Sequence, residues 1–231
     1  MRGMRHVLTY HKYTQRLAQV VGAIGIPYRV DHAKVAMVAI VRSKEEMERV
    51  VSIYQAQDYA HTHLVVFLDK FDGYIDVYNE YNTEEISTFM LSYLTQYNAL
   101  SEILDGFEWM AYVNREDYYG PSYVSDYILA ARYADANILT KGDHYTFDGT
   151  LEKQDTDASY RYVFDAVPTR SLVKPAALRF YSVKEALDVL TKDASLQELA
   201  QSGERIFSID PYQYVKGGAN LSDAMVQEVT L

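Results

Sequence analysis

Two short apolar runs, separated by one segment of helical length, constrain the fold of this chain more than any other feature. Residues 35–41 and 64–68 are entirely apolar, and each is short enough to be a strand covered on both faces. Between them, Ser43 and Glu46 form a capping-box pattern ahead of a segment with apolar residues on one side. The sequence therefore predicts a strand–helix–strand unit in a parallel sheet with a right-handed crossover.

The rest of the chain continues as an α/β pattern. Apolar runs predict further strands at 109–113, 137–140, 160–167 and 205–209. Helical spacing predicts helices at 7–25, 86–104 and 123–133, and two more after the capping-box pairs Ser182 with Glu185 and Ser195 with Glu198. Residues 70–85 are expected to form a loop with a short helix, 146–159 a polar loop, and 216–231 a tail that frays.

Composition and charge disfavour some classes of partner but do not identify a function. The 231 residues carry a net charge of −10, which disfavours nucleic acid or an anionic membrane as a partner. No apolar run approaches the roughly 20 residues needed to cross a bilayer, and there is no cysteine. We expect a cytoplasmic protein. The 22 tyrosines suit sugar or nucleoside stacking, but they suit sheet edges and a subunit interface equally well.

An acidic motif follows the strand predicted at 109–113. It reads Asn114-Arg115-Glu116-Asp117, and a Gly-Pro pair then turns the chain into a helix. Ligands bind at the carboxyl ends of parallel strands, where carboxylates can share a divalent cation with phosphate groups. The other interpretation of this motif is an exposed turn before a helix.

Several segments in order resemble family-two glycosyltransferases. The resemblance is carried by Leu94-Thr-Gln-Tyr-Asn98 and by Trp109-Met-Ala-Tyr-Val-Asn-Arg-Glu-Asp-Tyr-Tyr-Gly-Pro-Ser-Tyr123. It continues in the motifs of residues 130–138, 141–142 and 207–215. The subgroup that this chain resembles most is that of bacterial wall-polymer and spore-coat glycosyltransferases.

The resemblance implies an α/β domain of the GT-A fold, with a mainly parallel sheet flanked by helices. It covers residues 34–216, which leaves a helical extension at 1–33 and a tail at 217–231. Residues 10–17 resemble the end of a spore-maturation-type sugar-transferase module. That segment is either the remnant of a larger two-module ancestor or an ordinary surface helix.

The family's site residues can be carried over to a small set of positions. The resemblance implies that Arg42, Asp69, Asn98 and Arg115 contact the nucleotide-sugar donor. It implies that Glu116 and Asp117 hold Mg²⁺ or Mn²⁺, which would act as a Lewis acid on the departing diphosphate. The catalytic base of inverting members falls near Asp193. Asp165 and Arg170 belong to the part that faces the acceptor.

This chain departs from the family pattern at the metal motif. Where the family has Asp-x-Asp, the first acid is replaced by Asn114, and Arg115 places a positive charge beside the expected cation. Arg115 can instead pair with the diphosphate, because a guanidinium binds phosphate in a bidentate fork. The sequence is therefore compatible with either a divalent cation or Arg115 as the group that binds the diphosphate.

Two classes of function follow. The first is inverting transfer of a sugar from a nucleotide-diphosphate sugar to a glycan or wall-polymer-type acceptor. The second is a GT-A domain without catalysis, which serves as a binding or assembly module or as a nucleotide-sugar sensor. A second copy of the chain or a partner glycosyltransferase module is a further expected partner.

Overall fold

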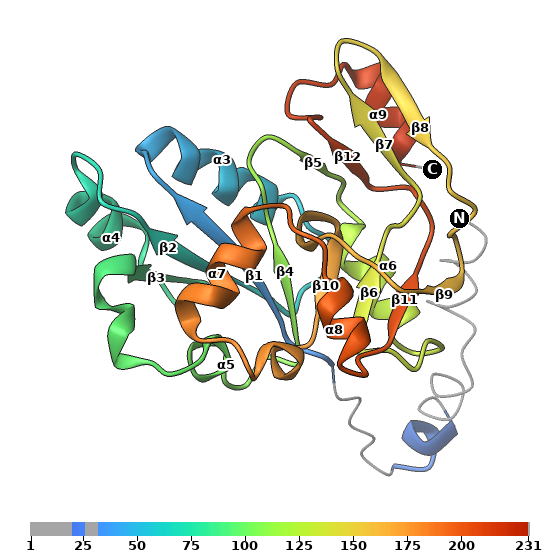
Figure 1. Ribbon diagram of the computed structural model, residues 1–231, viewed down its shortest axis with the longest axis horizontal. Helices are drawn as coiled ribbons and strands as arrows, with labels where there is room; N and C mark the ends of the chain where they lie inside the picture. The colour runs from blue at the N-terminus through green and yellow to red at the C-terminus, as the bar shows by residue number, and fades with distance from the viewer. Residues whose placement is uncertain (1–19, 26–31, 231) are drawn as a thin grey trace.

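The computed structural model describes residues 20–25 and 32–230 (Figure 1). An eight-stranded sheet has the order β3-β2-β1-β4-β10-β6-β11-β9, and a four-stranded sheet has the order β5-β12-β7-β8. The strands of the large sheet are β1 (Val35–Val41), β2 (Thr62–Leu68), β3 (Ile86–Met90), β4 (Trp109–Tyr112), β6 (Ile138–Thr140), β9 (Arg161–Val163), β10 (Ser171–Val173) and β11 (Ile206–Ser208).

The expected parallel unit is confirmed. Strands β3, β2, β1 and β4 are parallel neighbours, and β10 is antiparallel to both β4 and β6. The first apolar run forms β1, in which six of seven residues are buried. Because β1 lies inside the sheet and both of its faces are covered, an unbroken apolar sequence is what this position requires.

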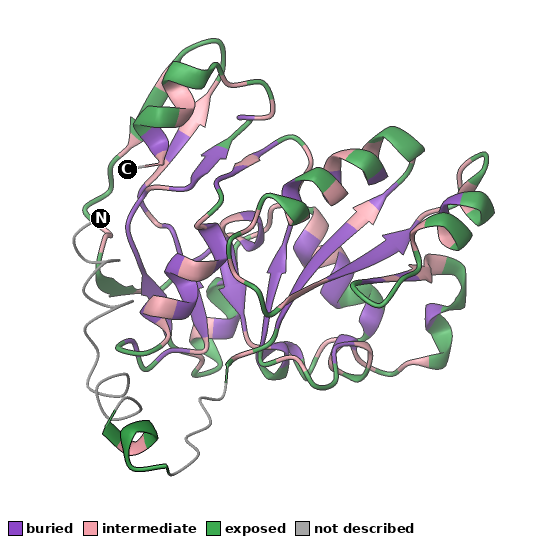
Figure 2. Ribbon diagram, turned by 180° about the vertical axis from the view of Figure 1, so that it is seen from behind, coloured by how far each residue is buried: buried purple, intermediate pink, exposed green. Residues whose placement is uncertain are grey.

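Helices cover both faces of the large sheet (Figure 1). On one side, side chains of α3 (Lys44–Gln55), α4 (Tyr74–Tyr81) and α6 (Tyr123–Ala130) pack against alternate residues of β1. On the other side lie α5 (Leu100–Ile103), α7 (Val183–Thr191) and α8 (Gln197–Gln201). Figure 2 shows the buried strands between partly exposed helices. The expected α/β architecture with a mainly parallel sheet is therefore confirmed.

The smaller sheet joins segments that are far apart in the sequence. It contains β5 (Tyr118–Tyr119), β12 (Tyr214–Lys216), β7 (His144–Phe147) and β8 (Leu151–Gln154). Strand β12 is antiparallel to β5 and parallel to β7. This pairing sets the end of the chain beside the acidic motif, which immediately precedes β5.

Four local predictions were wrong. The helix expected at 86–104 is β3 followed by the 3₁₀ helix η1 (Leu91–Gln96) and the short α5, because Ile86 and its neighbours pair with the free edge of β2. The polar loop at 146–159 contains the β7–β8 hairpin. Strand β10 was missed, since three residues between the 3₁₀ helices η2 (Pro168–Arg170) and η3 (Pro175–Leu178) carry no measurable periodicity. The N-cap residue of α8 is Leu196 rather than Ser195, although Ser195 Oγ accepts from the N–H of Gln197, the first residue of the helix, at 3.1 Å.

Residues 20–23 are helical, and Gly25 follows them with a φ of 75°, as expected for a glycine that ends a helix. The rest of the N-terminal helix and the sugar-transferase-like segment at 10–17 lie outside the described residues. Within the described ranges, no helix has both the length and the apolar character that crossing a membrane requires.

The tail does not fray. It contains α9 (Asp223–Val229), and Val229 is buried in a cluster with Tyr145 and Val215 of the smaller sheet. The carbonyl oxygen of Val229 also accepts a hydrogen bond of 2.8 Å from the backbone N–H of Gln213. The tail is therefore part of the fold that holds β12 in place.

We predict that Val229→Ala destabilises the protein by about 2 kcal/mol, because it removes two buried methyl groups from this small cluster. The free energy of unfolding, measured by urea denaturation, tests this. Gln227→Ala, on the exposed side of the same helix, is the matched control and should change stability by less than about 0.5 kcal/mol. Equal effects of the two substitutions would contradict the packing of α9.

Candidate functional site

A pocket opens at the carboxyl ends of β1 and β2. Arg42 follows β1 and Asp69 follows β2, and their side chains form an ion pair with an Nε–Oδ2 distance of 3.2 Å at its mouth. The pocket has a volume of about 490 Å³. Its other walls are apolar residues of β1, η1 and α7, together with polar groups of α7. The structure thus brings together two of the residues that the resemblance assigned to the donor.

Helix α7 contributes a wall that sequence reasoning missed. Its N-cap Ser182, the charged Lys184 and Asp188, and the apolar Leu187 line the same pocket, about 120 residues beyond Asp69. The capping box of Ser182 with Glu185 is confirmed and fixes the start of this helix. Only the packing of α7 across the sheet brings these groups to the pocket, so no local signal could have revealed them.

Glu46 links the pocket to the acidic motif. Ser43 caps α3 as predicted, but the Glu46 carboxylate accepts from the backbone N–H of Arg42 at 2.7 Å rather than from Ser43. Its other oxygen pairs with Nη1 of Arg115 at 3.1 Å. Arg115 also pairs through Nε with Glu116 at 3.1 Å. The two predicted donor-binding arginines are therefore held by one glutamate.

Asp117 has a different position from Glu116. It is only 2 % exposed and accepts hydrogen bonds of 2.8 Å from the Tyr214 hydroxyl and from the backbone N–H of Gly217. Burial raises the pKa of Asp117 above its usual value, although both hydrogen bonds oppose the shift. Both of its oxygens are in use. Asp117 therefore acts as an internal anchor for β12.

Asp193 lies at the other end of the same network. The Thr169 hydroxyl donates to one of its oxygens at 2.8 Å, and the Lys216 ammonium donates to the other at 2.6 Å. Thr169 Oγ1 also lies 3.3 Å from the Tyr214 hydroxyl, so the two carboxylates lie close together, although each hydroxyl already donates its one proton to its own carboxylate. Burial favours a higher pKa for Asp193, but the bonds from Lys216 and Thr169 outweigh it and leave the pKa below its usual value.

Four buried tyrosines pack against one another beside these hydrogen bonds. Tyr119, Tyr123, Tyr127 and Tyr214 form edge-to-face and tilted ring contacts. The Tyr119 hydroxyl accepts from the N–H of Asn114 and donates to the carbonyl of Thr169, both at 2.9 Å. These four tyrosines therefore pack in the core and are not available to stack on a sugar or nucleoside.

The residues of the motif fit a divalent cation poorly. Asn114 Oδ1 accepts from the Glu116 N–H at 3.2 Å, Glu116 is paired with Arg115, and Asp117 is buried with both oxygens engaged. In the part of the chain that the structure describes, no group of three or more His, Asp or Glu side chains is arranged to hold a metal ion. Mg²⁺ and Mn²⁺ prefer several converging oxygen ligands, which this arrangement does not offer.

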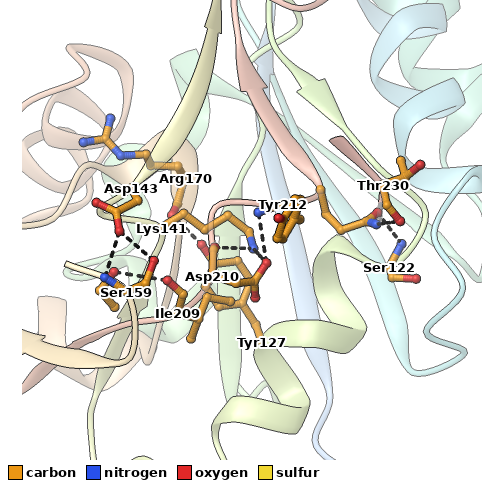
Figure 3. A network of polar contacts seen from close by, with 12 residues as sticks. Ser122, Tyr127, Lys141, Asp143, Ser159, Arg170, Ile209, Asp210, Tyr212 and Thr230 are labelled. Carbon is orange, nitrogen blue, oxygen red and sulfur yellow. Dashed lines mark hydrogen bonds and ion pairs between the residues drawn. The ribbon is translucent and has the colours of Figure 1, made fainter. Parts of the chain in front are cut away.

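A buried ion pair lies just after β6 and β11. Lys141 is 0 % exposed, and its ammonium lies 3.6 Å from Oδ1 of Asp210 and 5.2 Å from the centre of the Tyr127 ring (Figure 3). Next to it, a side chain on Gly142 would come within 2.9 Å of Ser208 Oγ. The two motifs at 141–142 and 207–215 therefore belong to one structural unit that ties β6 to β11.

The remaining predicted residues are separate from the pocket. The Asn98 side chain donates to Glu102 at 3.1 Å, and Asp165 accepts from Ser195 at 2.6 Å. Arg170 lies near Asp193 and His144, and its buried Nε has no hydrogen-bond partner among the described residues. Its guanidinium points away from the Lys141–Asp210 pair (Figure 3).

His144 makes this site sensitive to acid. Its Nδ1 donates to the carbonyl of Gly142 at 3.1 Å, and its ring lies 6.3 Å from that of Tyr214. Burial, and then the nearby charge of Arg170, lower the pKa of His144 from its usual 6.5 to about 4. In the unfolded chain this imidazole binds a proton at higher pH, so its contribution to stability is complete above pH 6.5 and is lost as the pH falls toward 4.

We predict that the wild type loses about 2 kcal/mol more stability between pH 6.5 and pH 4 than His144→Gln does. Urea denaturation at several pH values measures this difference. His61→Gln, at an exposed histidine, is the control and should follow the wild-type curve. Parallel curves for wild type and His144→Gln would show that His144 is not buried in its neutral form.

Comparison with known proteins supports the architecture. No family model and no curated protein sequence matches this chain. Among solved structures it is similar to S. aureus TarS 1-349, with a TM-score of 0.54 and 13 % identity over 85 % of this chain and 69 % of that one. The complexes of TarS 1-349 with UDP-GlcNAc and with UDP give TM-scores of 0.54 and 0.55, at 15 % and 14 % identity. Against the longer TarS structure the chain covers 42 % of the length. The chain therefore shares the α/β fold of these structures, which is consistent with the expected GT-A type.

Proposed function

We propose that this protein transfers a sugar from a nucleotide-diphosphate sugar to an acceptor hydroxyl, with inversion at the anomeric carbon. The observation that supports this most is the continuity of the site. Arg42 and Asp69 at the pocket mouth connect through Glu46 to Arg115, and the hydroxyls that bind Asp117 of the same motif and Asp193 lie 3.3 Å apart. The structures of TarS with UDP and with UDP-GlcNAc make a UDP-sugar the first donor to test.

Each group has a role in this scheme. The pocket between Arg42, Asp69 and α7 takes the nucleoside, and the diphosphate extends from it toward Arg115. Asp193 takes the proton from the acceptor hydroxyl as the acceptor oxygen attacks the anomeric carbon from the face opposite the leaving diphosphate. The bond from the anomeric carbon to the phosphate oxygen breaks, and its electron pair remains on the diphosphate. Lys216 and Thr169 hold the Asp193 carboxylate in position.

The acceptor belongs to the half of the site around Asp193 and Arg170. We propose a glycan or wall-polymer-type acceptor, in line with the family that the sequence resembles. Its hydroxyl would approach Asp193 from the side on which that carboxylate remains partly exposed.

One observation favours a second candidate, a nucleotide-sugar sensor without catalysis. Both oxygens of Asp193 already accept hydrogen bonds, and its lowered pKa makes it a weaker base. A donor pocket with a weak base would bind the nucleotide sugar without transferring it. The two candidates share the pocket and differ only at Asp193.

We predict that Asp69→Asn lowers the affinity for a UDP-sugar about tenfold, because it removes the partner that orients Arg42 and a hydrogen-bond acceptor of the pocket. Isothermal titration calorimetry with UDP-, GDP- and CDP-sugars tests this. Asp105→Asn removes the same charge at the opposite ends of the strands and should bind as the wild type does. If the wild type binds none of these three nucleotide sugars, both candidate functions are refuted.

We predict that Asp193→Asn keeps donor binding within about threefold of wild type but lowers the transfer rate by about 10² or more, as the loss of a general base does. Product analysis by mass spectrometry after incubation with donor and a cell-wall glycan fraction measures the transfer. Thermal unfolding verifies that the variant is folded despite losing the charge that pairs with Lys216. Donor binding by the wild type without hydrolysis or transfer would favour the sensor.

A further inference from the structure

We infer that Arg115 binds the donor diphosphate directly, in the position where related sites use a divalent cation, and that Glu116 occupies Arg115 until the donor arrives. This inference rests on the proposed function. It also replaces the expected roles of Glu116 and Asp117 as ligands of Mg²⁺ or Mn²⁺, which the arrangement of the motif does not favour.

The first argument is the position of Arg115. Its Nη1 is fixed by Glu46, whose side chain is only 15 % exposed and also holds the backbone N–H of Arg42 at the end of β1. Arg42 lines the pocket mouth. Burial raises the pKa of Tyr112 to about 12, and the charges of Arg42 and Arg115 both oppose this shift, as expected if both guanidinium groups lie on the Tyr112 side of the site. A diphosphate that leaves the pocket past Arg42 therefore meets Arg115 next.

The second argument is the way Glu116 contacts Arg115. Its carboxylate lies on the Nε side of the guanidinium at 3.1 Å and is 64 % exposed. The single Nε–Oε1 contact shows where an anionic oxygen binds this guanidinium, and a phosphate group can occupy the same side in a bidentate manner. An exposed ion pair of this kind is weak. A diphosphate carries more charge than one carboxylate, so it can displace Glu116 while Glu46 keeps Arg115 oriented.

The third argument is chemical. In the transfer reaction, the electron pair of the broken bond is left on the diphosphate, where negative charge grows. A fixed guanidinium stabilises that charge as a divalent metal ion would, and it requires no additional protein ligands. Placing a divalent cation beside Arg115 would instead bring two positive centres together. The replacement of the first motif acid by Asn114 removes one carboxylate that such a cation would need.

The test compares uridine with UDP, each in EDTA and in Mn²⁺, for the wild type and for Arg115→Gln, Arg115→Lys and Glu116→Gln. Calorimetry measures UDP binding, and ligand-observed NMR measures uridine binding. We expect the wild type to bind UDP at least tenfold more tightly than uridine in EDTA. Arg115→Gln should reduce UDP affinity to nearly that of uridine, and Arg115→Lys should lose most of the gain, since an ammonium lacks the bidentate fork.

The decisive variant is Glu116→Gln, because the two mechanisms predict opposite signs. If Glu116 merely occupies Arg115, its neutralisation should tighten UDP binding about threefold or more in EDTA and leave uridine binding unchanged. If Glu116 is a metal ligand, the wild type should need Mn²⁺ for tight UDP binding, and Glu116→Gln should abolish that gain. The second result would overturn the inference.

A matched control is Arg205→Gln, which breaks a comparable exposed ion pair with Asp135 elsewhere on the molecule. It should bind both ligands as the wild type does. Uridine binding with no additional affinity for UDP would overturn the inference about Arg115 and leave the nucleoside pocket standing. Failure of the wild type to bind either ligand would overturn the proposed function, and the inference with it.

Discussion

The hydroxyl group of Tyr119 makes the pair of hydrogen bonds on which the rest of the site depends. It accepts from the backbone of Asn114 and donates to the carbonyl of Thr169, so it joins the loop after β4 to the 3₁₀ helix before β10. Without it the Asn114 N–H would lose its hydrogen bond, and the Thr169 carbonyl would keep only the longer bond of 3.4 Å from Tyr123. A buried polar group left unpaired costs more than an average hydrogen bond contributes. Burial raises the pKa of Tyr119 far above its usual value, and it therefore remains a hydroxyl at any physiological pH. Because these loops are fixed relative to each other, Asp117 and Asp193 can share a network.

The same construction explains why two neighbouring acids have unlike properties. Asp117 faces inward, where Tyr214 and Gly217 use both of its oxygens, whereas Glu116 faces outward and contacts Arg115. Burial separates a carboxylate that anchors a strand from one that is free to exchange partners. Arg115, which pairs with Glu116 and Glu46, gives the site a permanent positive charge, whereas a typical acidic motif would have to bind a cation.

Prediction from the sequence succeeded where local pattern and tertiary environment agree. The run at 35–41 is apolar because β1 is covered on both faces, and Ser43 caps α3 as the pattern indicates. It failed where long-range pairing overrides local preference. Residues 86–90 have a spacing compatible with a helix, but the free edge of β2 recruits them as a strand. Residues 223–229 seemed patternless, although Val229 completes a small core that exists only after β12 has paired with β7.

By itself, the sequence determined the α/β class, the parallel β1–β2 unit, the meeting of Arg42 with Asp69 and the altered acidic motif, because each depends on residues close to a strand end. Only the tertiary structure decided what those residues do. The α7 wall of the pocket, the Glu46 carboxylate shared by two arginines, and the adjacent Tyr214 and Thr169 hydroxyls that bind Asp117 and Asp193 all join segments that are distant along the chain. Hydrogen bonds between such segments leave no periodic trace in the sequence, since they require particular groups at particular points in space rather than a repeated spacing.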